Sequence, residues 1–559
     1  MKNTSENSYL LFLVSFVVTG LLVGTPAYAQ DKTGEIDKIF SWATQSTPGC
    51  AVAVSLHGKV VVNRAYGMAD LERDVPITTY TIFDAGSVVK QFVAASILLL
   101  VEEGKLSLTE DIRKYIPELA DTGHKIKLDH LLSHTSGIRD WTGIRPLAEG
   151  DPDVLTLILR QRGLNFAPGE EWSYSNSGFE LLKEIITRTS GMSFSEYARK
   201  RLFEPLGMKS STYVVDMTDV VKNRALAYKN ENGRWKLDMY LGNDRGGGGL
   251  LTTPTDLLTW NDALTNNRLG AFVTEKLHEP ATLNNGRKLS YARGLQVEPF
   301  RRGGTLVWHS GGSAGYSALL GRLPEQGLSV AIMCNKDGGA QSAYAGRIFD
   351  LFLLPAAGES AAESNTQAAN IGGAGVAVGD LRGRAGLFFN EETDQPLRLA
   401  VNNNMLAIAG GSPLVALASD HFRNQRASLS FMSQAEFELQ FLSADQFEIK
   451  TKEGVRTRYR RAQTNAPAPA DLQAFAGRYR SDEIGAFFDI APGKDGLTVR
   501  ANDAAGGEFK PVDRDTFQLA GVILRFRRDK AGKIVAVDYS NPVVRNIQFT
   551  RLSDRPNGR

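Results

Sequence analysis

Apolar positions change their spacing several times along the chain, and each change predicts a different element. The longest apolar run, SVVKQFVAASILLLVEEGKL, begins at Ser87 and contains good helix formers, no proline, and a glycine at position 104 that can end a helix. Residues 92–101 are apolar almost all round, which is typical of a buried central helix. This run is too short to cross a bilayer.

Strand patterns lie on both sides of this helix. Residues 49–67 form two β-rich runs around His57–Gly58, which predicts a hairpin. Residues 305–335 contain three further strand patterns, and residues 342–352 return to a helical pattern. Strands at both ends, with helices and loops between them, predict one antiparallel sheet closed by the terminal segments. We therefore expect an α+β layer domain over residues 35–355.

The composition changes after Pro355. Residues 356–379 are rich in Ala, Gly, Ser and Asn, which predicts a linker. Two similar stretches follow, 380–463 and 471–553, and each opens with Asp-Leu, a glycine and aromatic residues before short alternating strands. They predict a duplicated all-β module with barrel-like strand spacing, joined by a Pro/Ala-rich hinge. Neither copy contains a nucleophile–base cluster, so we assign the chemistry to the first domain.

Charge and the N-terminal residues narrow the class of protein. The 559 residues carry 64 Lys and Arg against 62 Asp and Glu, with no basic stripe, which argues against a nucleic-acid partner. Residues 1–29 have an apolar core followed by Ala27-x-Ala29, which predicts a signal peptide cleaved before Gln30; a retained N-terminal anchor is the alternative. We expect an exported protein, periplasmic or secreted, with no membrane span in the mature chain.

Candidate chemistry begins with Ser87-Val-Val-Lys90. A chain of this length contains roughly one or two S-x-x-K matches by chance, so the spacing alone decides little. On a helix, however, residues i and i+3 share a face, which would place Lys90 beside the Ser87 hydroxyl at the mouth of a buried helix. A nucleophile of this kind needs further groups that converge on it.

Tyr-x-Asn occurs three times, and only one occurrence has a suitable setting. Tyr174-Ser-Asn176 follows a Pro-Gly turn and precedes a helical pattern, so it should lie on a structured loop. The occurrence at Tyr228 is expected in a hairpin loop and the one at Tyr539 in a turn.

Histidines offer no metal site. His309-Ser310-Gly311 lies on a predicted strand, where a satisfied core histidine is the alternative to a functional one, and His134 is expected to cap its own turn. The remaining histidines lack metal-ligand spacing, and the chain has no G-x-S-x-G, phosphate loop or H-E-x-x-H. We expect neither a metal nor a cofactor.

Taken in order, three short motifs resemble those of the serine β-lactamase and penicillin-binding protein superfamily, specifically its class C branch: Ser87-x-x-Lys90, Tyr174-x-Asn176 and His309-x-Gly311. Four longer stretches agree with it: IKLDHLLSHTSGI, RLFEPLGMKSST, GGGGLLTTPTDLLTW and WHSGGSAGYSALL. The likeness covers residues 35–354. It implies an antiparallel sheet with helices on both sides.

The resemblance also implies roles. Ser87 would attack a carbonyl, and its own amide and that of Gly312 would form the oxyanion hole. Either Lys90 or an ionised Tyr174 would be the acylation base, and Tyr174 would then activate water, since no E-x-x-L-N glutamate is present. Asn176 would hold Lys90 and the substrate amide, with His309 and Gly311 on the substrate-binding strand.

One departure bears on the substrate. Class C β-lactamases carry Lys-Thr-Gly as the third motif, whereas His309-Ser-Gly resembles D-aminopeptidases and some D-Ala-D-Ala carboxypeptidases. A histidine there implies a weaker, pH-dependent positive charge, which argues against efficient β-lactamase activity. The two β-modules are also similar in layout to D-aminopeptidases, where a barrel loop limits the site to a free N-terminus.

These likenesses imply an exported serine peptidase or amidase that acts on peptides containing D-amino acids through an acyl-enzyme. A carboxylesterase, a weak β-lactamase and a non-enzymatic penicillin-binding or scaffold protein remain alternatives. The oligomeric state stays open.

Cys50 and Cys334 are the only cysteines. The sheet implied by the family makes their strands antiparallel neighbours, and an exported chain with two cysteines allows a disulfide. Because facing strands often strain such a bond, we favour two buried, unpaired thiols that pack as small hydrophobic side chains.

Overall fold

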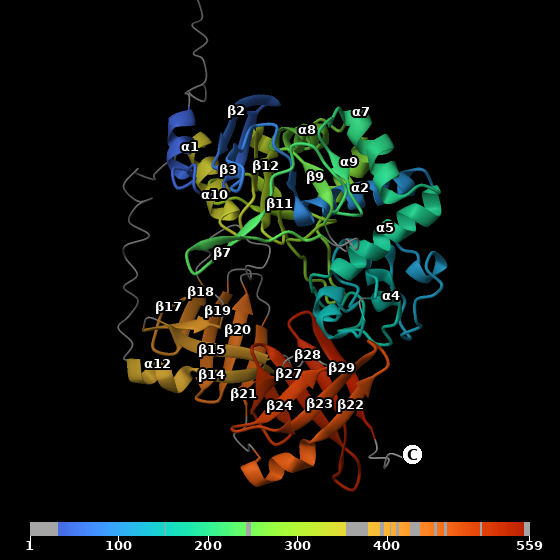
Figure 1. Cartoon of the computed structure of the whole chain (residues 1–559), viewed down its shortest axis with the longest axis vertical. Coiled ribbons are helices and arrows are strands. Elements are labelled where there is room, and N and C mark those ends of the chain that lie inside the picture. The colour runs from blue at the N-terminus through green and yellow to red at the C-terminus, as the bar shows by residue number, and fades with distance from the viewer. Residues whose placement is uncertain are drawn as a thin grey trace, which may run out of the picture.

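The computed structural model describes residues 32–150, 152–241, 248–353, 378–391, 396–402, 404–409, 413–424, 437–451, 456–462, 467–502 and 506–552. The predicted signal peptide and all but the last two residues of the predicted linker lie outside them. The described residues build an α+β domain followed by two all-β units, which confirms the expected fold class (Figure 1).

A six-stranded antiparallel sheet organises the first domain, in the order β10-β11-β12-β13-β1-β2. Its strands are β1 (Cys50–Leu56), β2 (Lys59–Tyr66), β10 (Gln296–Pro299), β11 (Thr305–Ser313), β12 (Tyr316–Leu323) and β13 (Leu328–Cys334). Because β1 pairs with β13, the two ends of the domain meet in the middle of the sheet, as the sequence predicts.

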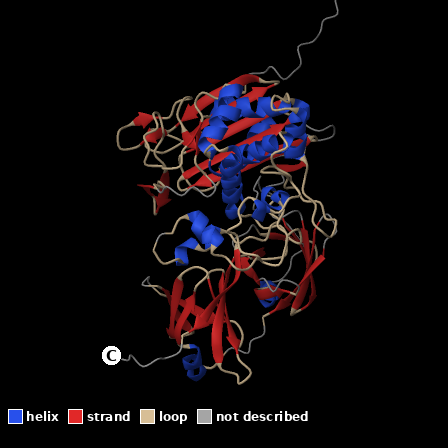
Figure 2. Ribbon diagram, turned by 90° about the vertical axis from the view of Figure 1, so that its right-hand side faces the viewer, coloured by secondary structure: helices blue, strands red, loops and turns tan. Residues whose placement is uncertain are grey.

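Helices cover both faces of this sheet (Figure 2). Alternate residues of β1 explain why: Ala51 and Ala53 pack into the core with α2 (Val89–Glu102) and α8 (Pro254–Thr265). Val52 and Val54 face the opposite way, into a second core with α1 (Thr33–Ile39) and α10 (Gln341–Phe352). The remaining helices are α3 (Leu128–Leu132), α4 (Val154–Leu159), α5 (Asn176–Ser190), α6 (Phe194–Ala198), α7 (Glu204–Leu206) and α9 (Ala271–His278).

Short turns and strands connect these layers. The helical turns are η2 (Gly86–Val88), η3 (Ile112–Lys114), η4 (Trp141–Gly143), η5 (Arg145–Leu147), η6 (Arg199–Phe203) and η7 (Pro324–Gln326). The short strands are β3 (Met68–Asp70), β4 (Val75–Pro76), β5 (Phe83–Asp84), β6 (Thr212–Tyr213), β7 (Tyr228–Glu231), β8 (Arg234–Leu237) and β9 (Leu250–Thr252). The motif at Tyr228 therefore lies in a hairpin strand, not in a hairpin loop.

The two all-β units repeat one plan, which confirms the predicted duplication. Each has a short helix, α12 (Val378–Arg384) or η8 (Pro469–Phe475), followed by eight antiparallel strands. The first unit comprises β14 (Gly386–Asn390), β15 (Pro396–Asn402), β16 (Met405–Ile408), β17 (Leu414–Ala416), β18 (His421–Asn424), β19 (Phe437–Ser443), β20 (Gln446–Thr451) and β21 (Arg456–Arg461). The second comprises β22 (Gly477–Ser481), β23 (Ala486–Pro492), β24 (Leu497–Ala501), β25 (Gly507–Pro511), β26 (Thr516–Leu519), β27 (Val522–Arg528), β28 (Ile534–Asn541) and β29 (Val544–Arg551).

The two units differ in closure. Strands β22–β29 form a closed barrel, in which β22 pairs with β29. In the first unit β14 pairs with β21 in the same way, but the sheet is open between β16 and β17 apart from an isolated bridge between Ala407 and Pro413. Among all described residues, no helix is both long and apolar enough to pass through a membrane.

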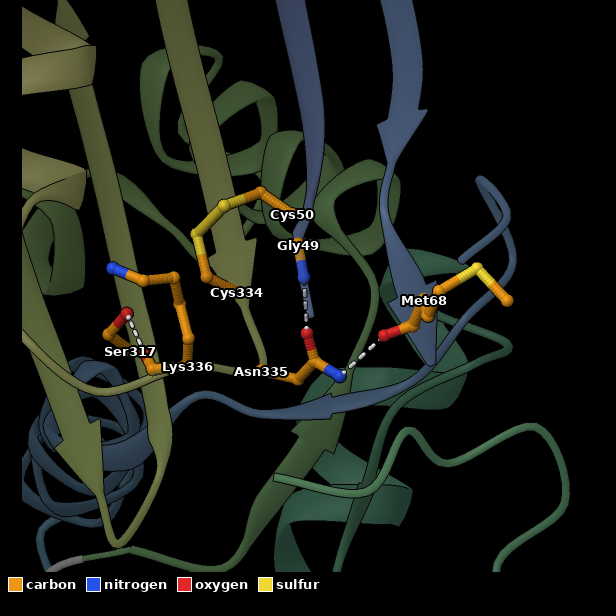
Figure 3. The surroundings of a disulfide bond; sticks show 7 residues. All are labelled: Gly49, Cys50, Met68, Ser317, Cys334, Asn335 and Lys336. Atoms are coloured by element: carbon orange, nitrogen blue, oxygen red, sulfur yellow. Dashed lines mark hydrogen bonds between the residues drawn. A yellow bond between two sulfur atoms is a disulfide. The ribbon is translucent and has the colours of Figure 1, made fainter. Parts of the chain in front are cut away.

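Cys50 and Cys334 form a disulfide, so the expectation of two free thiols is wrong (Figure 3). The strand register places them directly opposite each other, with Cα atoms 4.0 Å apart. A buried hydrogen bond of 2.8 Å from the Gly49 amide to Asn335 Oδ1 holds the same strand ends together. The register of β1 against β13, which the sequence does not reveal, decided the outcome.

We expect the disulfide to stabilise the first domain, because it joins residues 284 positions apart. Loop-closure entropy gives an upper figure of about 5 kcal/mol for a loop of that length. Protein purified under oxidising conditions and then unfolded should show no titratable thiol. The Cys50→Ala/Cys334→Ala variant should unfold at lower denaturant than the wild type; equal midpoints would contradict a stabilising role.

Candidate active site

Ser87 lies in the tight turn η2, at the point where α2 begins. Asp84 shapes this turn, because its Oδ1 accepts a hydrogen bond of 2.8 Å from the Gly86 amide. Gly86 itself has a φ of +52°, a conformation that favours glycine. The turn leaves Ser87 partly exposed while its neighbours in the chain are buried, and so it presents the hydroxyl to the surface of the domain.

Lys90 lies one helical turn further along and is fully buried. Its Nζ is 3.1 Å from Ser87 Oγ and donates a hydrogen bond of 2.9 Å to Asn176 Oδ1. The rings of Tyr174 and Phe179 lie against it, with centroids 4.8 and 5.4 Å from Nζ. Burial lowers the pKa of Lys90 to about 7, although the charge of Asp140 acts in the opposite direction. A large fraction of Lys90 is therefore a free amine near neutral pH.

Tyr174 and Asn176 come from the loop that starts α5, with Ser175 as its N-cap. Burial raises the pKa of Tyr174 well above its usual range, and a hydrogen bond with Ser87 opposes this only in part. The phenol therefore keeps its proton. Of the two bases that the sequence leaves open, the electrostatics favour Lys90.

The strand that carries the third motif touches the nucleophile turn. A Cβ on Gly311 would lie 1.9 Å from the Ala85 carbonyl oxygen, and one on Gly86 would lie 2.6 Å from the Gly312 nitrogen. Only glycine at both positions permits this approach. It brings the backbone of Gly312 next to that of Ser87, as an oxyanion hole built from these two amides requires.

His309 does not offer the charge expected from the sequence. Its side chain is fully buried, and burial together with the nearby Lys90 charge lowers its pKa to about 3. Near neutral pH the imidazole is uncharged. The expected pH-dependent positive charge for a substrate carboxylate is therefore not present at this position.

A chain of hydrogen bonds explains why His309 stays neutral. The Ser175 amide donates to His134 Nδ1 (3.1 Å), so His134 carries its proton on Nε2 and donates to the Tyr291 hydroxyl (3.0 Å). Tyr291 then donates to His309 Nε2 (3.0 Å), and His309 Nδ1 donates to the Ser310 carbonyl (2.6 Å). A proton added to His309 would leave the Tyr291 hydroxyl without an acceptor.

Asp140 is a buried group of this site that none of the three sequence motifs contains. Its Oδ2 accepts from the backbone amide of Asn176 (2.5 Å) and from Asn176 Nδ2 (3.1 Å), and its Oδ1 accepts from the amide and hydroxyl of Thr142 (both 2.8 Å). Burial raises its pKa, which these hydrogen bonds counteract. The only signal in the sequence is the position of Asp140 just after the SHTSGI stretch.

The arrangement can carry out acyl transfer. It joins a hydroxyl, an adjacent amine of lowered pKa, a protonated phenol and two backbone amides. Within the part of the chain that the structure describes, no group of three or more His, Cys, Asp or Glu side chains could hold a metal ion.

Comparisons with known proteins identify the family of the first domain. The family model described as Beta-lactamase matches residues 36–353, more than half of the chain. A D-aminopeptidase from Brucella melitensis biotype 2 is 26% identical over 538 residues, which cover 90% of this chain and 96% of that protein. A penicillin-binding protein of Bacillus subtilis is 27% identical over 303 residues, covering 50% of this chain and 66% of the relative.

Among solved structures, an octameric penicillin-binding protein homologue from Pyrococcus abyssi superposes with a TM-score of 0.53 at 25% identity. It covers 76% of this chain and 97% of its own. The likeness supports the fold assigned above.

Proposed function

The chain belongs to the beta-lactamase family and is a serine hydrolase, and we propose that it cleaves peptides or amides of D-amino acids through an acyl-enzyme on Ser87. The observation that carries the mechanism is the convergence on Ser87 Oγ of Lys90 Nζ, 3.1 Å away, and of the Tyr174 hydroxyl. The substrate class rests on the D-aminopeptidase relative, because the match extends through both β-units.

In the first step Ser87 Oγ attacks the substrate carbonyl carbon while Lys90, as the free amine, takes the hydroxyl proton. The amides of Ser87 and Gly312 stabilise the oxyanion. As the tetrahedral intermediate collapses, Tyr174 gives its proton to the leaving nitrogen and regains one from Lys90. Water then attacks the acyl-enzyme, and the same groups move the protons in reverse.

Asn176 and the third-motif strand position these groups. Asn176 holds the amine of Lys90, while Gly311 lets the strand lie against Ser87. His309, being neutral, contributes to the shape of that strand and provides no counter-charge for a substrate carboxylate. This favours substrates other than β-lactams, whose carboxylate would need a fixed cation there.

We also propose that the protein is exported, with residues 1–29 removed. The Cys50–Cys334 disulfide supports this, since such bonds persist mainly in oxidising compartments. N-terminal sequencing of the protein isolated from its host tests the cleavage, because an intact residue 1 would contradict it.

Parallel assays test the substrate. We expect D-Ala-p-nitroanilide to be hydrolysed at least about tenfold faster than its L-isomer, with p-nitrophenyl acetate also cleaved and a chromogenic cephalosporin turned over slowly. A D-Ala-D-Ala peptide, scored for release from either end, separates aminopeptidase from carboxypeptidase activity. Ester cleavage without preference for D-residues would instead favour a carboxylesterase, and fastest turnover of the cephalosporin would favour a β-lactamase.

A further inference from the structure

The closed barrel of the second all-β unit, called the second barrel below, lies directly against the segment of the first domain that holds the site (Figure 1). Ile144, between η4 and η5, and Leu157 of α4 are fully buried in the barrel's own hydrophobic core. The hairpin of β28 and β29 contacts the segment around Asp140, and Glu483, between β22 and β23, forms an ion pair with Arg139. Asp140 itself is in direct contact with this hairpin through its backbone amide.

Hydrogen bonds join this hairpin to Asp140 and to the residues before and after it in the chain. The Asp140 amide donates to the Val543 carbonyl (3.4 Å), and Asn541 Nδ2 donates to the Gly143 carbonyl (2.9 Å). On the other side Arg139, also buried, donates to the carbonyls of Arg545 (2.9 Å) and Asn546 (3.0 Å).

The same hairpin holds the loop that leads to Tyr174. Arg545 forms a two-pronged ion pair with Glu171, with both N–O distances 2.9 Å, and its amide donates to Asn165 Oδ1 (2.8 Å). Asn165 Nδ2 donates in turn to the Val543 carbonyl (3.0 Å). One hairpin thus fixes two loops of the active site.

Asp140 decides which way the Asn176 amide points. An ionised carboxylate only accepts hydrogen bonds, so the Asn176 NH2 group must face Asp140 and its Oδ1 must face Lys90. Without that carboxylate the amide could turn over and direct its NH2 group at Lys90. The amine would then lose its acceptor and its fixed position beside Ser87.

We propose that Asp140 is a positioning residue for the hydrolysis, and that the β28–β29 hairpin holds it so that Asn176 stays turned toward Lys90. The inference rests on the proposed function of Lys90 as the base. It gives the second barrel a role in holding the catalytic groups at their positions, in addition to any effect on substrate choice.

The charges around Lys90 determine in which direction its pKa should move when Asp140 is replaced. Asp140 and Glu180 raise the pKa of Lys90, Lys183 lowers it, and the neighbouring Tyr174, His134 and His309 are uncharged near neutral pH. Removing the charge of Asp140 should therefore lower the pKa of Lys90 further and move the acid limb of the pH–rate profile to lower pH.

Two variants of the full-length protein test Asp140, with p-nitrophenyl acetate as the substrate. Asp140→Asn should reduce kcat by about tenfold to a hundredfold with little change in KM, and should shift the acid limb to lower pH. Asp140→Glu keeps the charge and should keep the limb near its wild-type position, although kcat stays low. Wild-type kcat and an unmoved limb in Asp140→Asn would overturn the proposal.

A second variant, Gly143→Ala, displaces the hairpin and leaves the Asp140 side chain unchanged. It also tests the proposal if Asp140→Asn does not fold. A Cβ on Gly143 would lie 2.7 Å from Val543 Cγ2 and 2.8 Å from Asn541 Nδ2, so Gly143→Ala must push the hairpin away. We expect kcat to fall several-fold, and part of it to return when Val543→Ala is added. Gly346→Ala, whose Cβ would meet no atom within 4 Å, is the matched control and should be unchanged.

If Gly143→Ala retains wild-type kcat and pH profile, the hairpin has no positioning role. The ester readout also separates this proposal from the substrate proposal. Failure to cleave D-aminoacyl anilides would remove the proposed substrate and leave the Asp140 comparison intact. Ester turnover that survives in Ser87→Ala would instead remove the mechanism on which both depend.

Discussion

Replacing Ser87 with alanine should reduce kcat/KM for every substrate by at least about a thousandfold and abolish covalent labelling by a fluorophosphonate or a fluorescent penicillin. The hydroxyl oxygen, Oγ, is the only heavy atom removed, and Lys90 Nζ lies 3.1 Å from it. Without an attacking oxygen the free amine and the oxyanion amides have no intermediate to stabilise, and only slow attack by water remains.

Ser96→Ala is the matched control for this experiment. Ser96 lies on α2, which begins directly after the turn that holds Ser87, and it is fully buried. Its hydroxyl donates to the Phe92 carbonyl (2.8 Å), on the opposite side of the helix from Ser87. It should keep activity within about twofold, since only a local helix bond is lost. Undiminished labelling of folded Ser87→Ala protein would contradict the assignment of the nucleophile.

The layers of the first domain could be predicted because local patterns determine them. The alternation in β1 sorts its side chains between two cores, and the all-round apolar run of α2 marks a helix buried on every side. Ser87 and Lys90 are three residues apart where the predicted helix begins, so their contact follows from the spacing together with the helical pattern.

Asp140 and the charge of His309 could not be predicted, because each depends on segments that meet only in the fold. The neutral state of His309 requires Tyr291 and His134, which approach from two distant loops, together with complete burial. Asp140 becomes part of the site only because α5 brings Asn176 into hydrogen-bonding contact with it. No spacing rule connects these residues.

The β-units show the same division. Their strand patterns and their duplication are visible in the sequence, since each copy repeats one order of short alternating strands. Their contribution to the site is not visible there, because Asn541 and Val543 contain no titratable group and Arg545 meets Glu171 only in the fold. Asn541 and Val543 act through a side-chain amide, a backbone carbonyl and packing against Gly143.

Lys90 offers the second large effect, and two substitutions separate its possible roles. If the free amine is the base, both Lys90→Met and Lys90→Arg should reduce kcat/KM by about a hundredfold to ten-thousandfold, because neither side chain can take a proton near neutral pH. If Lys90 instead only supplied positive charge to an ionised Tyr174, Lys90→Arg would keep much of the activity.

The pH profile gives the sign of the Lys90 effect. Because the pKa of Lys90 is lowered to about 7, the amine is protonated and inactive below that pH and free above it. Wild-type kcat/KM for p-nitrophenyl acetate, measured from about pH 5 to about pH 9, should therefore rise through neutrality and level off. The residual rate of Lys90→Met should lack this rise. A wild-type acid limb that persists unchanged in Lys90→Met would assign it to another group and remove Lys90 as the base.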